Sequence, residues 1–157
     1  MKIELRRITH SAALSQETTA YRAEIWIDGE LAFHAHNQGH GSADFFDKVG
    51  CWDLAEVDTW LKANRAPTVL GDITLDHDLE AEVSDLLTRA LEGRRLKRLL
   101  RTNLVTIEKD QIFQHPLRKR PIATISSAVL ATNPKAVVVN SAGDEVFEHA
   151  LDLLMTR

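Results

Sequence analysis

The alternation of apolar and polar residues predicts strands in the first part of the chain. Residues 3–8 alternate in this way, and so do residues 21–27 and 31–36. The last two runs flank Asp28-Gly29, a dipeptide typical of a β-hairpin turn. We therefore expect one strand followed by a hairpin.

The same alternation indicates the register of this hairpin. A two-residue loop places Trp26 opposite Leu31, whereas a three-residue loop that includes Ile27 places Ile25 opposite Leu31. We expect the three-residue loop with a bulge, because it gathers the apolar side chains on one face. The opposite, wetter face then carries Arg22, Glu24, His34 and His36.

Apolar residues at helical spacing predict helices in the rest of the chain. One helix covers residues 54–64, and the longest begins near residue 79. We expect Gly93 to mark a close contact or a weak point in it, because the apolar stripe resumes on a rotated face beyond this residue. Two further helices are predicted over residues 121–132 and 144–154.

Shorter segments complete the prediction of the fold. Residues 104–107 and 111–114 are typical of a second hairpin, residues 136–139 of a short strand or a buried connection, and residues 68–75 are ambiguous. The order of the elements predicts an α+β fold. We expect an antiparallel sheet of the N-terminal strands plus the second hairpin, packed against three to four helices.

Length and composition are those of one folded domain. The chain has 157 residues, of which 44% are hydrophobic and 27% charged, and this excludes a disordered chain. We expect a single α+β domain over residues 1–157. Cys51 is the only cysteine, and we expect it to be a buried structural thiol. Because no apolar run follows the charged N-terminus, we expect a cytoplasmic protein without a membrane segment.

Charge is distributed unevenly along the chain, although the net charge is only −4. Residues 1–92 hold 8 Lys or Arg against 17 Asp or Glu, whereas residues 93–120 hold 9 against 2. A local cationic segment of this kind can hold phosphate groups or an acidic protein surface.

The candidate binding residues are the cations of this segment. Arg94, Lys97, Arg98 and Arg101 recur at helical spacing and share one helix face, and the second hairpin can bring a further basic run to it. The candidate residues are Arg94, Arg95, Lys97, Arg98, Arg101, Arg118, Lys119 and Arg120. The alternative is a solvated helix face whose arginines pair with the acidic first half of the chain.

A second set of residues has metal-ligand chemistry. His34 and His36 project to the same face of their strand, and a glycine-containing loop can bring His40 or Asp44 to them. Three such ligands and a water molecule form an open zinc site of the kind used in metal-assisted hydrolysis. The alternative is an exposed sheet face that tolerates histidines, with no cofactor.

Other motifs for catalysis are weak. The loop over residues 39–42 can present backbone N–H groups to an anion, but we expect a tight structural turn there. The serines lie outside any context for a nucleophile, so no catalytic triad is predicted.

Two segments of the sequence resemble a known family of proteins. The hairpin Ile25-Trp26-Ile27-Asp28-Gly29 with its second strand, followed by Asn37-Gln38-Gly39-His40-Gly41, resembles a family of small bacterial and phage-borne proteins of unknown function. The basic helix end at residues 90–98 is similar as well. The resemblance implies no reaction, and it suggests a phage or mobile-element accessory setting.

We therefore expect a non-catalytic interaction module whose basic segment binds nucleic acid or an acidic protein surface. The alternative is a metal-dependent hydrolase that uses the histidine and aspartate set. Whether the protein is an enzyme, and its oligomeric state, stay open at this point.

Overall fold

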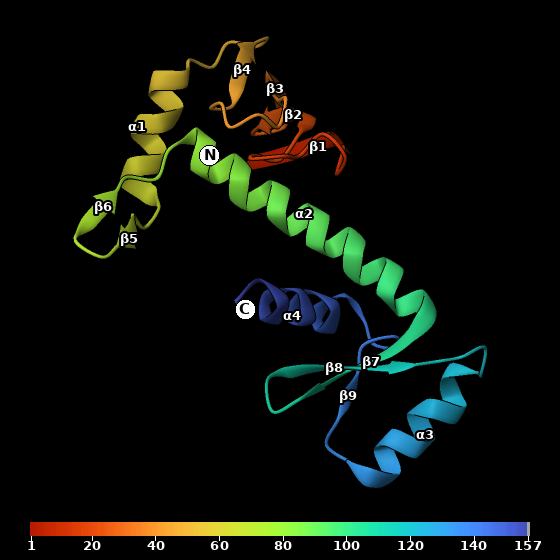
Figure 1. Ribbon diagram of the computed structural model, residues 1–157. Coiled ribbons are helices and arrows are strands. Elements are labelled where there is room, and N and C mark those ends of the chain that lie inside the picture. Colours follow the sequence, from red (N-terminus) through yellow and green to blue (C-terminus); the bar gives the residue numbers. More distant parts are fainter. Residues whose placement is uncertain (157) are drawn as a thin grey trace. The chain divides into compact units, whose positions relative to one another are not determined.

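The computed structural model describes residues 1–156, and within them it confirms the predicted α+β fold class. Four helices and nine strands follow one another within these described residues, and Figure 1 shows their arrangement. They are β1 (Ile3–His10), β2 (Tyr21–Ile27), β3 (Glu30–Asn37), β4 (Phe45–Lys48), α1 (Leu54–Asn64), β5 (Thr68–Leu70), β6 (Ile73–Leu75), α2 (Leu79–Thr102), β7 (Asn103–Glu108), β8 (Gln111–Pro116), α3 (Ile122–Thr132), β9 (Val137–Val138) and α4 (Asp144–Met155). No helix among residues 1–156 has the length and apolar character needed to cross a membrane.

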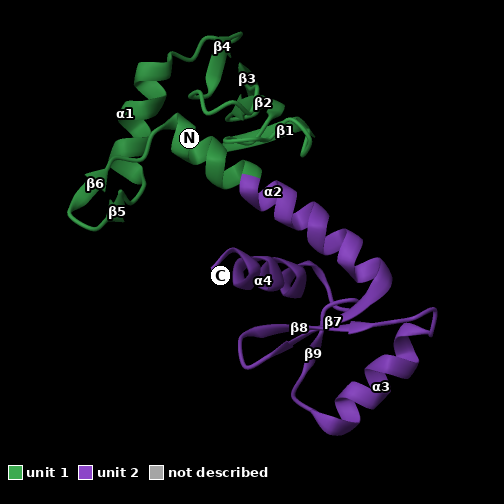
Figure 2. Ribbon diagram, viewed as in Figure 1, with its two compact units in different colours: residues 1–87 green, residues 88–157 purple. Residues whose placement is uncertain are grey.

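The chain forms two compact units (Figure 2). Unit 1 comprises residues 1–87, and unit 2 begins at Thr88. Helix α2 therefore begins in unit 1 and ends in unit 2. The single domain over residues 1–157 stays a prediction.

Unit 1 contains a four-stranded antiparallel sheet in the order β1-β2-β3-β4. The turn between β2 and β3 has two residues, Asp28 and Gly29, because Ile27 pairs with Glu30. The predicted three-residue loop is wrong in this respect. Both turn residues have positive φ, at 50° and 86°, as a tight type I′ hairpin turn requires.

The bulge that the apolar pattern demands lies inside β3 instead of in the turn. Trp26 pairs with Leu31 and Ile25 with Phe33, which leaves Ala32 as the extra residue. Ile25 and Phe33 are almost fully buried, and His34 on the other face is exposed. The predicted division of the two faces is therefore confirmed for these side chains.

The core of unit 1 also draws on α1 and on the first turns of α2. Val57 and Leu61 of α1 are fully buried, and so are Leu79 and Val83 of α2. The backbone N–H of Leu79 donates to Asp58 of α1 at 2.8 Å, which fixes the start of α2. Burial of each of these side chains contributes about 1.5 to 3 kcal/mol.

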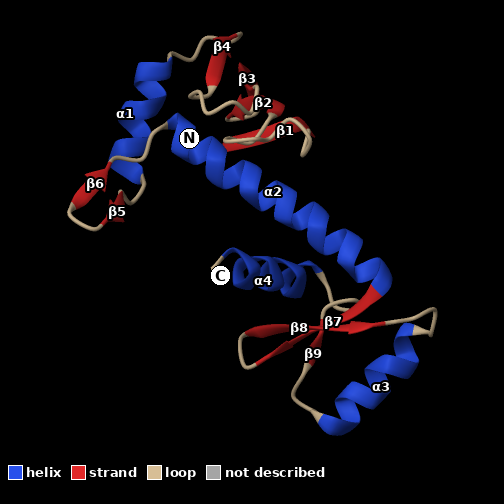
Figure 3. Cartoon of the chain, viewed as in Figure 1, coloured by secondary structure: helices blue, strands red, loops and turns tan. Residues whose placement is uncertain are grey.

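The ambiguous stretch over residues 68–75 forms a separate two-stranded hairpin of β5 and β6 (Figure 3). Leu70 pairs with Ile73 across the turn, and both side chains are exposed, at 60% and 61%. Directly paired residues lie on the same face of a hairpin, and every second residue of a strand returns to that face. The aliphatic side chains of Leu70, Ile73 and Leu75 therefore share one face, and the Val69–Thr74 pair lies on the other.

Unit 2 is a three-stranded antiparallel sheet in the order β8-β7-β9, with helices on both faces. Alternate residues of β7 face opposite ways. Val105 and Ile107 pack with Leu96 of α2 and with α4, whereas Leu104 packs with Ile125 of α3. The sheet therefore lies between α2 and α4 on one side and α3 on the other.

Candidate functional site

The predicted metal ligands of β3 lie on the outer face of the sheet of unit 1. His34 is opposite Glu24 and Asp47 across the neighbouring strands, and it is exposed. The ring of His36 stacks on Phe45 with 5.2 Å between the ring centroids, and its Nε2 lies 3.4 Å from Asp47. These two histidines thus share a face, as expected.

Asp44 points to the opposite face of the same sheet. Its carboxylate accepts a hydrogen bond from the Tyr21 hydroxyl at 2.5 Å and from the Asn37 amide at 2.8 Å, and both donors are buried. Burial and the adjacent Asp44 raise the pKa of Tyr21. His40 lies in the exposed loop beyond β3.

The structure therefore does not bring His34, His36, His40 and Asp44 together. The strand alternation sends the two β3 histidines to one face, while the buried Tyr21 and Asn37 hold Asp44 at the other. Among residues 1–156, no group of three or more His, Cys, Asp or Glu is placed to hold a metal ion.

The structure also tests the predictions for the glycine-containing loop and for Cys51 of unit 1. Gly39 of the loop has φ +87°, and a Cβ there would lie 2.1 Å from the Leu14 carbonyl oxygen. Its N–H donates to Asn37 Oδ1 at 2.8 Å, so this amide has a structural partner. Cys51 is exposed, so the prediction of a buried thiol is wrong.

The uneven charge of the sequence coincides with the division into two units. Residues 1–87 hold 7 Lys or Arg against 16 Asp or Glu, whereas residues 88–157 hold 12 against 7. Ion pairs inside unit 2 use few of these cations. Arg89 pairs with Glu148 and Asp152, and Arg95 pairs with Glu92 at 3.1 Å.

The C-terminal half of α2 is amphipathic. Leu96 is fully buried, and Leu99 and Leu100 pack on the same core. Arg94, Arg98 and Arg101 recur every three or four residues on the opposite side of the helix, and all three are exposed. Helix α2 continues through Gly93. A Cβ there would make only an ordinary contact, 3.8 Å from Leu151 Cδ2, so the predicted close contact at this residue is wrong.

Two of the predicted binding residues on α2 have partners within unit 2. Arg95 is held by Glu92 one turn earlier. The Lys97 ammonium lies over the ring of Phe147 in α4, 5.7 Å from its centroid. These two cations therefore flank the outer face and already have a structural role.

The basic run after β8 forms a tight turn beside the end of α2. The Arg120 N–H donates to the Leu117 carbonyl at 2.9 Å, and the Leu117 N–H donates to the Thr102 carbonyl at 3.0 Å. Arg118 and Lys119 occupy the two central positions with φ 49° and 64°. This backbone conformation is unfavourable for residues other than glycine, asparagine and aspartate, yet it presents both side chains to solvent.

One asparagine fixes the end of α2 relative to the sheet. The Asn140 amide donates to the carbonyls of Leu100 and Asn103 at 3.0 and 2.8 Å, and its oxygen accepts from the Val105 N–H at 2.8 Å. Helix C-termini leave carbonyl groups without intrahelical partners, and Asn140 satisfies one of them here. It thereby also fixes the position of Arg101.

We call the resulting surface the basic surface. It consists of Arg94, Arg98, Arg101, Arg118, Lys119 and Arg120. Within the described part of the chain, the side chains of Arg98, Arg101, Arg118 and Lys119 make no hydrogen bond or ion pair. The second hairpin thus returns its basic run to the helix end, as the sequence predicts.

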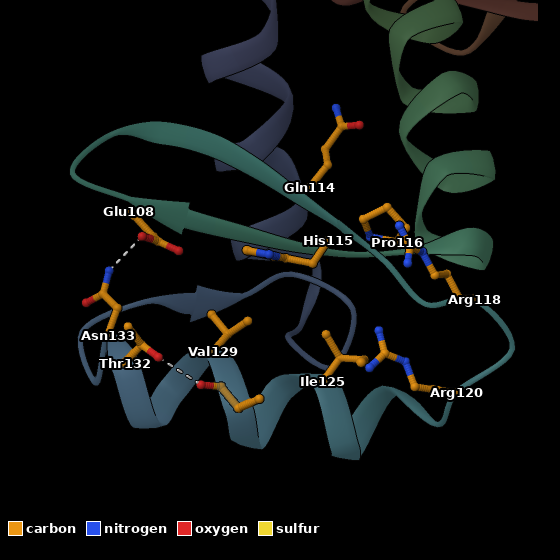
Figure 4. A pocket seen from close by; sticks show the side chains of 11 residues that line it. Glu108, Gln114, His115, Pro116, Arg118, Arg120, Ile125, Val129, Thr132 and Asn133 are labelled. Atoms are coloured by element: carbon orange, nitrogen blue, oxygen red, sulfur yellow. Dashed lines mark hydrogen bonds between the residues drawn. The ribbon is translucent and has the colours of Figure 1, made fainter.

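A cavity of about 610 Å³ opens beside this surface, between β8 and α3 (Figure 4). Arg118 and Arg120 lie at one end, and Glu108 and Asn133 at the other. The His115 ring extends between the strand and the helix in its middle. The cavity therefore combines cations, an apolar wall and a polar end.

Sequence reasoning missed the polar end of this cavity. Glu108 accepts from the Asn133 amide at 2.7 Å and from the hydroxyl of Thr106, which is fully buried, at 2.9 Å. Glu108 and Asn133 are 25 positions apart, so no local spacing joins them. The only available signal was the hairpin register, which places Thr106 and Glu108 on one face of β7.

Comparison with protein-family models, with curated proteins and with solved structures finds no significant match for this chain. The resemblance to a family of small bacterial and phage-borne proteins stays a prediction.

Proposed function

We propose that the protein is a nucleic-acid-binding module that holds phosphate groups on the basic surface of unit 2. The observation that carries this proposal is that four exposed cations have no partner among the described residues; they are Arg98, Arg101, Arg118 and Lys119. Guanidinium groups bind phosphate through two parallel hydrogen bonds, and cations spaced along a helix and an adjoining turn suit successive phosphates. An accessory role in a phage or mobile element is compatible with such a module.

The composition of the surface favours nucleic acid over an acidic protein. Protein interfaces have an apolar centre that is buried by the partner. The large apolar side chains on this part of α2, Leu99 and Leu100, are instead packed on the core of unit 2. A surface of cations without an exposed apolar centre is typical of phosphate binding.

Local energetics also favour a binding role. Like charges three or four residues apart on a helix are destabilising by a few tenths of a kcal/mol. Arg98 and Arg101 are three residues apart on α2 and form such a pair. Unit 2 therefore retains like charges on α2 at a small cost to its own stability, and an anionic partner would offset this repulsion.

The test is a charge reversal with a matched control. Arg98→Glu with Arg118→Glu should weaken binding of a labelled DNA oligonucleotide about tenfold or more at 0.1 M salt, since two phosphate contacts are lost. The slope of log affinity against log salt should flatten by roughly 0.7 to 0.9 for each lost contact. Lys109→Glu with Lys135→Glu changes the net charge equally at other exposed positions and should leave both quantities nearly unchanged.

Two results would contradict the proposal. One is a wild-type protein that binds neither DNA nor RNA at low salt. The other is equal weakening by the two double variants, which would show a general charge effect instead of a surface. Binding to polyglutamate but to no nucleic acid would assign the basic surface to an acidic protein.

A further inference from the structure

We propose that the cavity between β8 and α3 receives one unpaired base of a single-stranded nucleic acid, and this inference rests on the proposed function. The cavity adjoins the basic surface through Arg118 and Arg120, which belong to both. Its volume of about 610 Å³ lies within the usual range of small-ligand sites. A strand held on the basic surface therefore has an open cavity beside its phosphates.

The chemistry of the cavity changes from one end to the other. Arg118 and Arg120 supply cations at the first end, and Ile125 and Val129 of α3 supply an apolar wall (Figure 4). A nucleotide has the same succession of groups, since its phosphate is anionic and its base has apolar faces. The matching order favours a nucleotide over a purely apolar ligand.

The polar end of the cavity suits the edge of an unpaired base. Thr106 and Asn133 each donate one hydrogen bond to Glu108 and so orient its carboxylate. The carboxylate oxygens can accept further hydrogen bonds, and the Asn133 amide has a second N–H. An acceptor beside a donor complements the Watson–Crick edge of a base, and a duplex does not expose this edge.

Rings on β8 add stacking surfaces. Phe113 and His115 are two residues apart and lie opposite Thr106 and Leu104, so they share the face of the sheet that meets α3. Figure 4 shows His115 on this face and Gln114 pointing away from it. Phe113 is 41% exposed, and β8 is an edge strand. Single-stranded nucleic acids are recognised by stacking of unpaired bases on such rings.

The experiment fills the cavity without changing charge. Ala128 lines the cavity from α3 and is exposed, whereas its neighbour Ser127 is exposed and does not line it. The full chain and its Ala128→Phe and Ser127→Phe variants are titrated against a fluorescein-labelled single-stranded 12-mer and a duplex of equal phosphate number. Far-UV circular dichroism checks that each variant is folded.

Wild type should bind the single strand about tenfold more tightly than the duplex, as expected for one stacked base. Ala128→Phe should remove this preference and leave duplex affinity and its salt dependence unchanged, and Ser127→Phe should retain it. A 2-aminopurine in the strand should be quenched by wild type and not by Ala128→Phe.

Two outcomes overturn the inference while the proposed function stands. They are equal wild-type affinity for both forms, and a preference for the single strand that survives in Ala128→Phe. Absence of binding to either form overturns the proposed function and the inference together, so the two failures are distinguished by the duplex arm.

Discussion

We expect the Asn140 side chain to make a large contribution to the free energy of unfolding of unit 2, because it forms three hydrogen bonds. Replacement by alanine removes two hydrogen bonds donated to the carbonyls of Leu100 and Asn103 and one accepted from the Val105 N–H. Val105 is fully buried, so its N–H loses a partner that water does not easily replace.

The magnitude follows from these three bonds. A buried donor without a partner costs about 1 to 3 kcal/mol, and each of the other two bonds contributes about 0.5 to 1.5 kcal/mol. Asn140→Ala should therefore destabilise unit 2 by about 2 to 6 kcal/mol, which lowers its urea midpoint by roughly 1 to 3 M for an m value of about 2 kcal/mol per M. Asn103→Ala is the control, because its amide makes only a long 3.4 Å bond to Leu99 and a bond to the adjacent Thr102. It should cost less than about 1 kcal/mol.

The assay can separate the two units. All 3 tryptophans, Trp26, Trp52 and Trp60, lie in unit 1, so their fluorescence follows unit 1, whereas far-UV circular dichroism follows both units. If the units unfold independently, Asn140→Ala shifts the dichroism transition and leaves the fluorescence midpoint unchanged. If residues 1–157 form the single cooperative domain that the sequence predicts, both signals shift together.

An Asn140→Ala variant that lowers the dichroism midpoint no more than Asn103→Ala does would contradict this prediction. That result would mean that the three short hydrogen bonds are replaced by water at no cost. It would also mean that Asn140 does not fix the position of Arg101. The affinity of Asn140→Ala for DNA should therefore be measured on the same samples.

Two further predictions concern other parts of the chain. Arg65 donates two hydrogen bonds to Glu82, and these, with His77, hold the pKa of Glu82 below its ordinary value of 4.5. A carboxyl with a lowered folded pKa stabilises the fold above its unfolded pKa and loses that contribution as pH falls. Glu82→Gln should therefore cost about 1.5 to 3 kcal/mol at pH 7 and lose part of the acid sensitivity in tryptophan-detected urea unfolding between pH 3 and 7. An unaltered pH profile would contradict this assignment. In the β7–β8 turn, Lys109→Asn with Asp110→Gly relieves two positive φ values of 51° and 59°. It should raise the melting temperature of unit 2 by roughly 4 to 8 °C for a gain of about 1 kcal/mol, without altering DNA affinity, and a lower melting temperature would refute the strain argument.

Periodic patterns predict the elements of this fold well. The helix over residues 54–64 and the hairpin around residues 109 and 110 are confirmed, because their apolar spacing is regular and their ends carry turn residues. The β2–β3 register was harder to predict. The apolar faces of the hairpin require one extra residue, but alternation alone does not say whether it lies in the turn or, as observed at Ala32, inside the strand.

Candidate sites were predictable only where they depend on local spacing. The face of Arg94, Arg98 and Arg101 follows from helical periodicity, and it is confirmed as an exposed face. The predicted metal ligands do not depend on local spacing alone. The position of Asp44 is set by its hydrogen bond from the buried Tyr21 hydroxyl, which keeps it on the face opposite to His34 and His36. The Glu108–Asn133 pair of the cavity depends on tertiary packing for the same reason.

The turn over Leu117–Arg120 is where several local preferences are contradicted at once. A tight turn with two positive φ values favours asparagine and glycine, yet Arg118 and Lys119 occupy it. The first turn of a helix favours acidic side chains, yet α3 has none there and Arg120 lies just before it. Proteins depart from such preferences mainly at functional or strained sites, and the rest of the fold offsets the cost. Phosphate would offset the second departure, since it neutralises Arg120 and is favoured at the positive end of α3, whereas the left-handed backbone of Arg118 and Lys119 stays strained whatever binds. If the proposed function holds, an anion bound at this turn therefore offsets the unfavourable positive charge before α3.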